Sequence, residues 1–165
     1  MSLTLHTTLG DIKIELDCEY TPKNCENFLA LAASGLYNST QFHRSIPSFI
    51  IQGGDQTNTG KGGTSIYGEG NYIQDEYPVN GRTFSTKGII AMANSGPNTN
   101  ASQFFITYAP LPDLHNKFVI IGHILQGYDV LSKMESIPTK GKKHNPIEPI
   151  IINTITIHAN PFAIH

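Results

Sequence analysis

An arginine, two amides and aromatic rings occur together in two separate segments of the chain. In "FHRSIPSFIIQGGD", Arg44 and Gln52 stand on either side of Phe49. In "SQFFI", Gln103 and Phe105 are two residues apart, so on a β-strand their side chains share one face. Residues of these types suit an apolar pocket that is edged by a few fixed hydrogen-bond donors. The pattern alone is equally compatible with separate, half-exposed strand residues that form no site.

Other kinds of chemistry find less support in the sequence. The "TGKGG" segment lacks the Ser or Thr that a phosphate-binding loop requires after Lys61, and no helical pattern follows it. The seven histidines form no HExxH motif and no close Cys/His pair with zinc spacing, so no metal site is expected. Ser95 and Ser102 lie in "NSGPNTNASQFF", but neither belongs to the GxSxG motif of α/β-hydrolases.

Short strands are the elements that must position the two segments. Alternating apolar residues predict a hairpin at the N-terminus, and shorter apolar runs predict further strands along the chain. The ending "PIIINTITIH" predicts a strand whose alternation changes phase at Asn153-Thr154, which is typical of a β-bulge. The predicted strands are 3–7, 12–16, 42–46, 49–52, 88–93, 103–107, 118–124 and 149–158.

Only two helices are predicted. The first begins at Thr21-Pro22, as N-cap and first helical residue, and ends at Gly35; the second lies near 128–135. Many short strands with glycine-rich turns and so few helices favour a mainly β fold, a barrel whose open ends the helices cover. The segment 55–87 has no sustained periodicity, and its scattered aromatic residues favour an ordered loop that packs on the barrel.

Length and composition favour one domain over residues 1–165. The net charge is -2 and the Lys and Arg residues are scattered, so direct binding to nucleic acid is not expected. No apolar run is long enough to span a membrane, and the N-terminus lacks the basic region of a signal peptide. The two cysteines, Cys18 and Cys25, favour a reducing intracellular compartment, cytoplasmic or nuclear. The "KGKKH" run at 140–144 is typical of a solvated turn rather than a localisation signal.

Three segments together carry a family resemblance. "FHRSIPSFIIQGGD", the glycines at 60–63 and "MANSGPNTNASQFFIT" resemble the cyclophilins, a family of peptidyl-prolyl cis/trans isomerases, and the resemblance covers nearly the whole chain. It implies a closed, eight-stranded antiparallel β-barrel capped by two α-helices, no cofactor, and a monomer that acts on proline-containing peptides and proteins. The "ITIHANPF" ending resembles the peptidylprolyl isomerase-like 3 subfamily, which in animals is associated with the spliceosome.

The resemblance also assigns residues to a site. It implies that Arg44 and Gln52 are catalytic, with Arg44 as the hydrogen-bond donor to a twisted amide and Gln52 as the residue that holds it in place. The implied substrate-binding residues form a proline pocket, a loop edge and a backbone segment that pairs with the substrate: Phe49, Ile50, Gly60, Ala93, Asn94, Ser95, Gln103, Phe105, Leu114 and Phe118.

Two residues depart from the family pattern. Asp113 stands where many cyclophilins have the tryptophan that is associated with cyclosporin binding, so weak binding of that drug is expected. Phe118 stands where many have a histidine, and it can line an apolar pocket but cannot donate a hydrogen bond. Activity is therefore expected to be reduced or narrowed in substrate range. The alternative hypothesis is a binding module that recognises X-Pro segments in a spliceosomal or other ribonucleoprotein assembly, with weak or no catalysis.

Overall fold

The N-terminal hairpin shows how alternation builds the barrel wall. A computed structural model describes residues 1–158, and the last seven residues, which complete the "ITIHANPF" ending, lie outside the described residues. β1 (Ser2–Thr7) and β2 (Gly10–Leu16) pair antiparallel, as predicted. One face of the hairpin is fully buried in the core, through Leu3, Leu5, Ile12 and Ile14.

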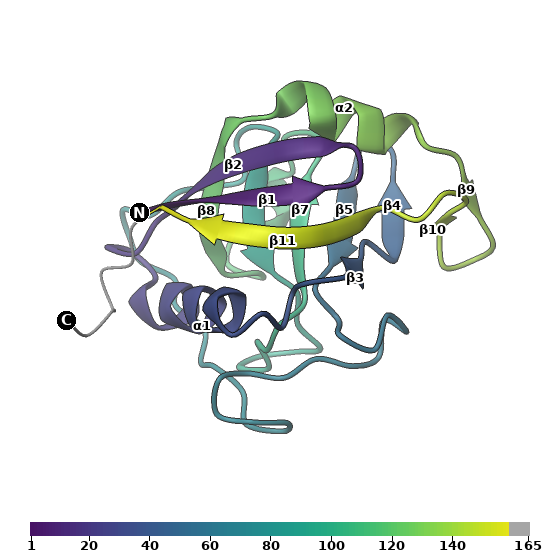
Figure 1. Cartoon of the computed structure of the whole chain (residues 1–165). Helices are drawn as coiled ribbons and strands as arrows, with labels where there is room; N and C mark the ends of the chain where they lie inside the picture. Colours follow the sequence, from purple (N-terminus) through teal and green to yellow (C-terminus); the bar gives the residue numbers. More distant parts are fainter. Residues whose placement is uncertain (159–165) are drawn as a thin grey trace.

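Nine strands form one antiparallel sheet in the order β3-β11-β1-β2-β8-β6-β7-β5-β4, and the sheet curls around a common core (Figure 1). α1 (Pro22–Ala33) and α2 (Tyr128–Ser136) lie at its opposite ends, close to the predicted limits. The sequence did not predict the separate hairpin of β9 (Thr139–Lys140) and β10 (Asn145–Pro146). The other strands are β3 (Thr40–Gln41), β4 (Arg44–Ile46), β5 (Ile50–Gly53), β6 (Ile89–Met92), β7 (Phe104–Thr107), β8 (Ile120–Gln126) and β11 (Ile151–Ile157).

The barrel differs from the expected closed ring of eight strands in the way it closes. β3 pairs with β11 and β4 pairs with β5, so the two end strands are not paired with each other. They are instead consecutive in the chain, with only Phe42 and His43 between them. The predicted strand 42–46 is divided here because the backbone changes partners. The Phe42 N–H still donates to Ile150 O on the β11 side (2.8 Å), whereas Ser45 already faces β5.

Both faces of the central strands β6 and β7 are covered, so every residue of these strands is buried. This explains why "IIAM" and "FFI" are continuous apolar runs, whereas a strand with one solvated face alternates. Alternate residues face the barrel core: Ile90, Met92, Phe104 and Ile106. The residues between them belong to a second apolar group, called here the outer cluster, which consists of Ile50, Phe84, Ile89, Ala91, Phe105 and Ile120.

Aromatic rings close one end of the core beneath α1. Phe28 of α1 lies edge-on to Phe104, with ring centroids 5.3 Å apart, and packs on Tyr37 at 5.0 Å. Such edge-to-face pairs add to the stabilisation that burial of the rings provides. Within residues 1–158, neither α1 nor any other helix is both long enough and apolar enough to cross a membrane.

α1 begins where predicted, but a distant residue caps its N-terminus. Thr21 precedes the helix, yet its hydroxyl donates to Ile120 O (3.0 Å) and makes no capping hydrogen bond. The carboxylate of Glu76 instead accepts hydrogen bonds from the backbone N–H groups of Lys23 (3.2 Å) and Asn24 (2.9 Å). A negative charge at this position also complements the helix dipole. The glycine-rich middle segment is thus ordered and tied to the barrel, as predicted.

The predicted change of phase in the last strand is a β-bulge. β11 pairs with β1 so that Thr7 lies opposite Ile152 and His6 lies opposite Thr154. Asn153 therefore has no opposite residue, which is the defining feature of a bulge. The structure confirms its predicted position.

Candidate functional site

A row of directly opposed residues crosses four strands of the sheet. Arg44 on β4 lies opposite Gln52 on β5, and Gln52 lies opposite Phe105 on β7. Phe105 in turn lies opposite Ala91 on β6. Directly opposed residues of antiparallel strands project from the same face of the sheet. The row therefore continues the outer cluster to the edge of the sheet and changes from apolar to charged along its length.

A chain of hydrogen bonds, called here the amide relay, holds the polar end of the row. Gln103 donates from Nε2 to the backbone carbonyls of Gly60 (3.1 Å) and Gly62 (2.7 Å). Its Oε1 accepts from Gln52 Nε2 (2.9 Å), and Gln52 Oε1 accepts from Arg44 Nη1 (3.4 Å). Because a carbonyl can only accept and a guanidinium can only donate, the glycine carbonyls determine the direction of both amides. Gln52 therefore presents its oxygen to Arg44.

The loop that carries these glycine carbonyls is organised around the buried side chain of Asp55. Asp55 Oδ2 accepts hydrogen bonds from the backbone N–H groups of Gly60 (2.8 Å) and Gly62 (3.0 Å). Its Oδ1 accepts from the N–H (2.8 Å) and the hydroxyl (2.7 Å) of Thr57. Burial by itself raises the pKa of Asp55, but the hydrogen bonds from Thr57, Gly62 and Gly60 outweigh it and lower the pKa below its ordinary value of 3.8.

Asp55 should make the stability of the protein depend on acid pH. A carboxyl whose pKa is lower in the folded than in the unfolded state stabilises the fold above its unfolded pKa, and this stabilisation is lost as the pH falls through the folded pKa. We expect the free energy of unfolding to decrease as the pH falls below about 4. Asp55→Asn should flatten this dependence and cost about 1–3 kcal/mol at neutral pH.

Urea unfolding of the wild type and the Asp55→Asn variant across the acid range measures this effect. Asp113→Asn, at an exposed position, is the matched control and should keep the wild-type pH dependence. Parallel stability curves for the wild type and Asp55→Asn would contradict the prediction.

The apolar part of the row is bordered by side chains that are partly exposed to solvent. Phe118 lies edge-on to Phe105, with ring centroids 5.2 Å apart, and Phe84 stacks on Phe105 at 6.2 Å. Phe105 is only 2% exposed, so its partly exposed neighbours form the accessible wall. Leu114, in the short 3-10 helix η1 (Pro112–Leu114), is one of these neighbours. The predicted substrate-binding residues that belong to the outer cluster or pack against it are Phe49, Ile50, Ala93, Phe105, Leu114 and Phe118.

Phe49 lies in the turn before β5, not in the predicted strand 49–52, because β5 begins at Ile50. The preceding residue, Ser48, has a left-handed backbone conformation with φ of 64°. Its N–H donates to Glu135 Oε2 of α2 at 2.7 Å. The Phe49 carbonyl accepts from the N–H of Tyr108 at 2.9 Å. α2 and the end of β7 therefore hold the turn that presents the Phe49 ring.

A cavity of about 490 Å³ adjoins the amide relay. The predicted site residues that line it are Gln52, Gly60, Ala93, Asn94, Ser95 and Gln103. Among residues 1–158, the backbone N–H and C=O of Asn94 have no hydrogen-bond partner, although its side chain donates to Lys117 O (3.0 Å). A backbone donor and acceptor at the end of a strand can pair with an extended peptide. The cavity thus has a polar edge suited to a peptide backbone.

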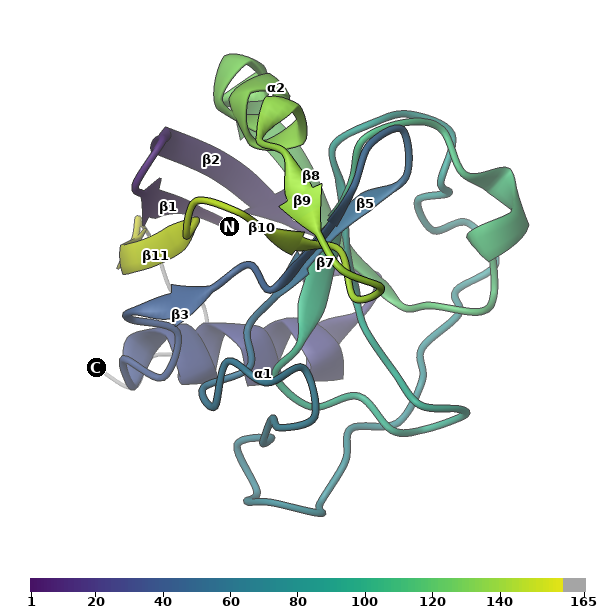
Figure 2. The same ribbon diagram turned by 90° about the vertical axis from the view of Figure 1, so that its right-hand side faces the viewer.

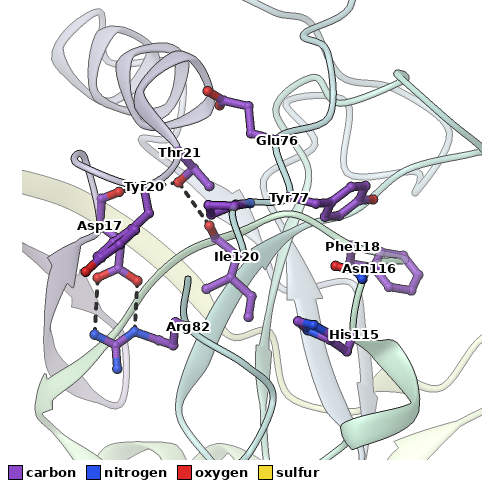
Figure 3. Close-up of a pocket in the computed structure, with 11 residues that line it drawn as sticks. Asp17, Tyr20, Thr21, Glu76, Tyr77, Arg82, His115, Asn116, Phe118 and Ile120 are labelled. Atoms are coloured by element: carbon purple, nitrogen blue, oxygen red, sulfur yellow. Dashed lines mark hydrogen bonds and ion pairs between the residues drawn. The ribbon is translucent and has the colours of Figure 1, made fainter. Parts of the chain in front are cut away.

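Phe118 also borders a second, smaller cavity that the sequence did not predict (Figure 3). Arg82 donates to Asp17 there, from Nε at 2.8 Å and from Nη2 at 3.2 Å, and so joins two distant segments. The volume of about 20 Å³ admits about one water molecule. No sequence pattern signals this cavity, because its lining comes from segments far apart in the chain, which include Tyr20, Tyr77 and His115.

The twelve predicted site residues thus lie in three adjoining groups: the amide relay, the outer cluster with its neighbours, and the larger cavity. That these residues bind a substrate stays a prediction. In the part of the chain that the structure describes, no three His, Cys, Asp or Glu side chains lie close enough together to hold a metal ion.

Comparison with known proteins identifies the family of this chain. The model of the family described as cyclophilin type peptidyl-prolyl cis-trans isomerase/CLD matches residues 2–157. The chain belongs to the cyclophilins. This cyclophilin is 51% identical over 163 residues to "Peptidyl-prolyl cis-trans isomerase-like 3" of Homo sapiens, and the match covers 99% of each chain. It is 53% identical over 165 residues to "Peptidyl-prolyl cis-trans isomerase CYP18-1" of Arabidopsis thaliana, again over 99% of each chain.

A solved structure extends the comparison to three dimensions. It is a cyclophilin type peptidyl-prolyl cis-trans isomerase of Cryptosporidium parvum, crystallised in the presence of the dipeptide Ala-Pro. The two structures have a TM-score of 0.91 and 49% sequence identity, over 97% of this chain and 100% of the other. The comparisons confirm the predicted family, its isomerase-like 3 branch and the mainly β fold. The protein is an enzyme of the peptidyl-prolyl cis-trans isomerase type.

Proposed function

We propose that this cyclophilin accelerates X-Pro isomerisation in protein substrates through Arg44, which stabilises the twisted amide while the outer cluster holds the proline ring. The observation that carries the proposal is the amide relay, in which two directed amides hold a guanidinium at the rim of an apolar surface. Membership of the family supports the reaction, and the arrangement of the residues supports the role given to each.

The reaction needs a group that favours a twisted peptide bond over both planar forms. Partial double-bond character sets a barrier of about 18–20 kcal/mol, and uncatalysed X-Pro exchange takes tens to hundreds of seconds. In the twisted state the prolyl nitrogen loses conjugation and gains lone-pair character. A donor aimed at that nitrogen acts on the transition state alone, which is the condition for faster reaction. Such a mechanism requires no metal, cofactor or covalent intermediate.

Arg44 has the properties of this donor. Its guanidinium is permanently protonated and planar, and within the described residues its side chain donates only to Gln52. Acceleration from about 0.01 per second to about 1–1000 per second needs about 3–7 kcal/mol. One preorganised donor contributes on the order of 3–4 kcal/mol. Arg44 can therefore supply the lower figure, and the remainder must come from positioning of the substrate.

The groups around Arg44 supply that positioning. The partly exposed rings of Phe49 and Phe118, with Leu114, offer an apolar surface for the proline ring. The backbone of Asn94 offers one donor and one acceptor to the residues before proline. Gln52 keeps the guanidinium at the rim, because its own amide cannot turn without breaking the bond to Gln103.

A second candidate function is recognition of X-Pro segments without fast catalysis, and one observation favours it. Phe118 lies edge-on to Phe105, which is only 2% exposed, and the Phe118 ring offers the pocket wall no hydrogen-bond donor. In that case the protein acts as a binding module in a spliceosomal or other ribonucleoprotein assembly, nuclear or cytoplasmic. The resemblance to the isomerase-like 3 subfamily supports such a setting.

Exchange NMR on a short X-Pro peptide separates the two functions. With enzyme present in small amounts, we expect the cis and trans signals to interconvert at about 1 per second or faster, against about 0.01 per second without enzyme. The Arg44→Ala protein is the control and should leave the exchange slow. Shifts that report binding without faster exchange in the wild type would favour the binding module instead.

A further inference from the structure

The β9–β10 hairpin lies beside the β4 edge of the sheet (Figure 1), and it faces the viewer in the turned view of Figure 2. The carbonyl of His144 accepts from the N–H of Ser45 at 3.0 Å, and Asn145 Nδ2 donates to the His43 carbonyl at 2.6 Å. His43 and Ser45 flank Arg44 in the chain. The hairpin is therefore anchored next to the charged end of the row that crosses the site.

The tip of this hairpin carries a concentration of positive charge. Lys140, Lys142 and Lys143 are exposed, and none of them forms an ion pair with an acidic residue among residues 1–158. Within this described part of the chain, Glu148 and Glu135 do not form ion pairs with these lysines either. Glu148 follows the hairpin and is exposed, and the carboxylate of Glu135 on α2 accepts a hydrogen bond from the turn before β5. Three of the nine lysines thus lie within four residues, in a chain whose net charge is -2.

The proposed binding mode directs the residues after the proline towards this tip. In the binding mode proposed above, residues before proline pair with Asn94 beyond β6 and the proline ring rests on the outer cluster near Phe105 of β7. In the sheet order β6-β7-β5-β4, residues that continue in the same direction would cross β5 and then β4. From β7 to the hairpin this path crosses three strand spacings of about 4.8 Å each, or about 14 Å. An extended peptide covers that distance in about four residues.

We propose that the hairpin tip binds acidic side chains about three to five residues after the proline, so that this cyclophilin prefers X-Pro segments followed by Asp or Glu. The proposal rests on the proposed function, because it uses the same peptide path through the proline site. Attraction between exposed charges is modest and is screened by salt. The preference is therefore largest at low ionic strength.

The double variant Lys142→Gln/Lys143→Gln tests the proposal. Both residues lie in the turn, outside the paired residues of β9 and β10, so the hairpin keeps its ladder. Three X-Pro peptides are compared: one with three Glu at the third to fifth positions after proline, one with three Gln there, and one with three Glu before the X-Pro pair. Fluorescence anisotropy gives the affinity of each peptide, and exchange NMR gives its isomerisation rate.

For the first peptide we expect the double variant to bind about three- to tenfold more weakly at low salt, with most of the difference lost at high salt. The other two peptides should bind both proteins equally. Lys13→Gln/Lys23→Gln, which removes the same charge from β2 and α1, is the matched control and should bind all three peptides as the wild type does.

Equal losses for all three peptides, or the same loss in the Lys13/Lys23 control, would overturn the proposal, because net charge and not the hairpin would then be responsible. Stronger hairpin-dependent binding of a single-stranded RNA of equal charge would overturn it as well. The Gln peptide tests the proposed function separately. If the wild type isomerises no peptide but binds the first one through the hairpin, the catalytic proposal fails and the hairpin proposal holds.

Discussion

Arg44→Ala should lower kcat/KM for a proline peptide by about a hundredfold to a thousandfold, the usual effect of removing one preorganised donor. The free energy of unfolding should change little, because Arg44 is partly exposed and its hydrogen bond to Gln52 is long, at 3.4 Å. Arg44→Lys should recover little activity, since an ammonium lacks the planar fork of a guanidinium. Separate measurement of kcat and KM should place most of the loss in kcat, because the interaction exists only in the twisted state.

Arg82, the only other arginine in the sequence, is the matched control. It donates two hydrogen bonds to Asp17, whose side chain is 9% exposed. Arg82→Ala leaves that carboxylate without this partner, so we expect it to cost about 1–3 kcal/mol of stability while kcat/KM stays close to the wild-type value. Arg44→Ala should therefore lower kcat/KM and leave stability nearly unchanged, whereas Arg82→Ala should lower stability and leave kcat/KM nearly unchanged. An Arg44→Ala protein as active as the wild type would rule out the proposed mechanism.

Asp113→Trp should tighten cyclosporin binding by about tenfold to a hundredfold. Asp113 is exposed in η1, directly before Leu114, which packs against the outer cluster. An indole at this position adds a large, rigid apolar surface and one N–H donor beside the proline pocket. The carboxylate of the natural residue must instead lose water when an apolar ligand covers it. Isothermal titration calorimetry of the wild type and the variant measures the difference.

Asp113→Asn separates the charge of the side chain from its shape. It removes the negative charge without adding aromatic surface, so we expect it to change cyclosporin affinity by less than about threefold. An equal gain for the Asn and Trp variants would mean that the charge is the cause. Tight binding by the wild type itself would show that the expectation of weak binding is wrong.

Features that depend on near neighbours in the chain could be predicted from the sequence. The two-residue repeat of a β-strand predicted that Gln103 and Phe105 share one face. In the structure Gln103 belongs to the amide relay and Phe105 to the adjoining outer cluster. The change of phase at Asn153 predicted a bulge because a single extra residue moves every later side chain to the other face. The start of α1 at Pro22 followed from the fixed φ of proline.

Features that depend on distant partners could not be predicted in this way. Nothing around Gln103 indicates that its amide meets the Gly60 carbonyl, since that contact exists only after the barrel forms. The β9–β10 ladder consists of two residue pairs without apolar alternation, so no period marks it. Phe49 lies in a turn that Glu135 holds from α2, so a strand that begins at residue 49 is the wrong interpretation of this apolar run. Asn94 and Leu114 were assigned by the family resemblance, not by any local pattern.

The capping of α1 by Glu76 has a consequence for how the protein folds. The two partners are 53 residues apart in the chain, so the first turn of the helix gains its acceptors only after the middle segment has docked. A helix of 12 residues is marginally stable on its own in water. We therefore expect α1 and the docked loop to open as one cooperative unit, and the amide hydrogens of Lys23 and Asn24 to exchange with solvent when that loop detaches.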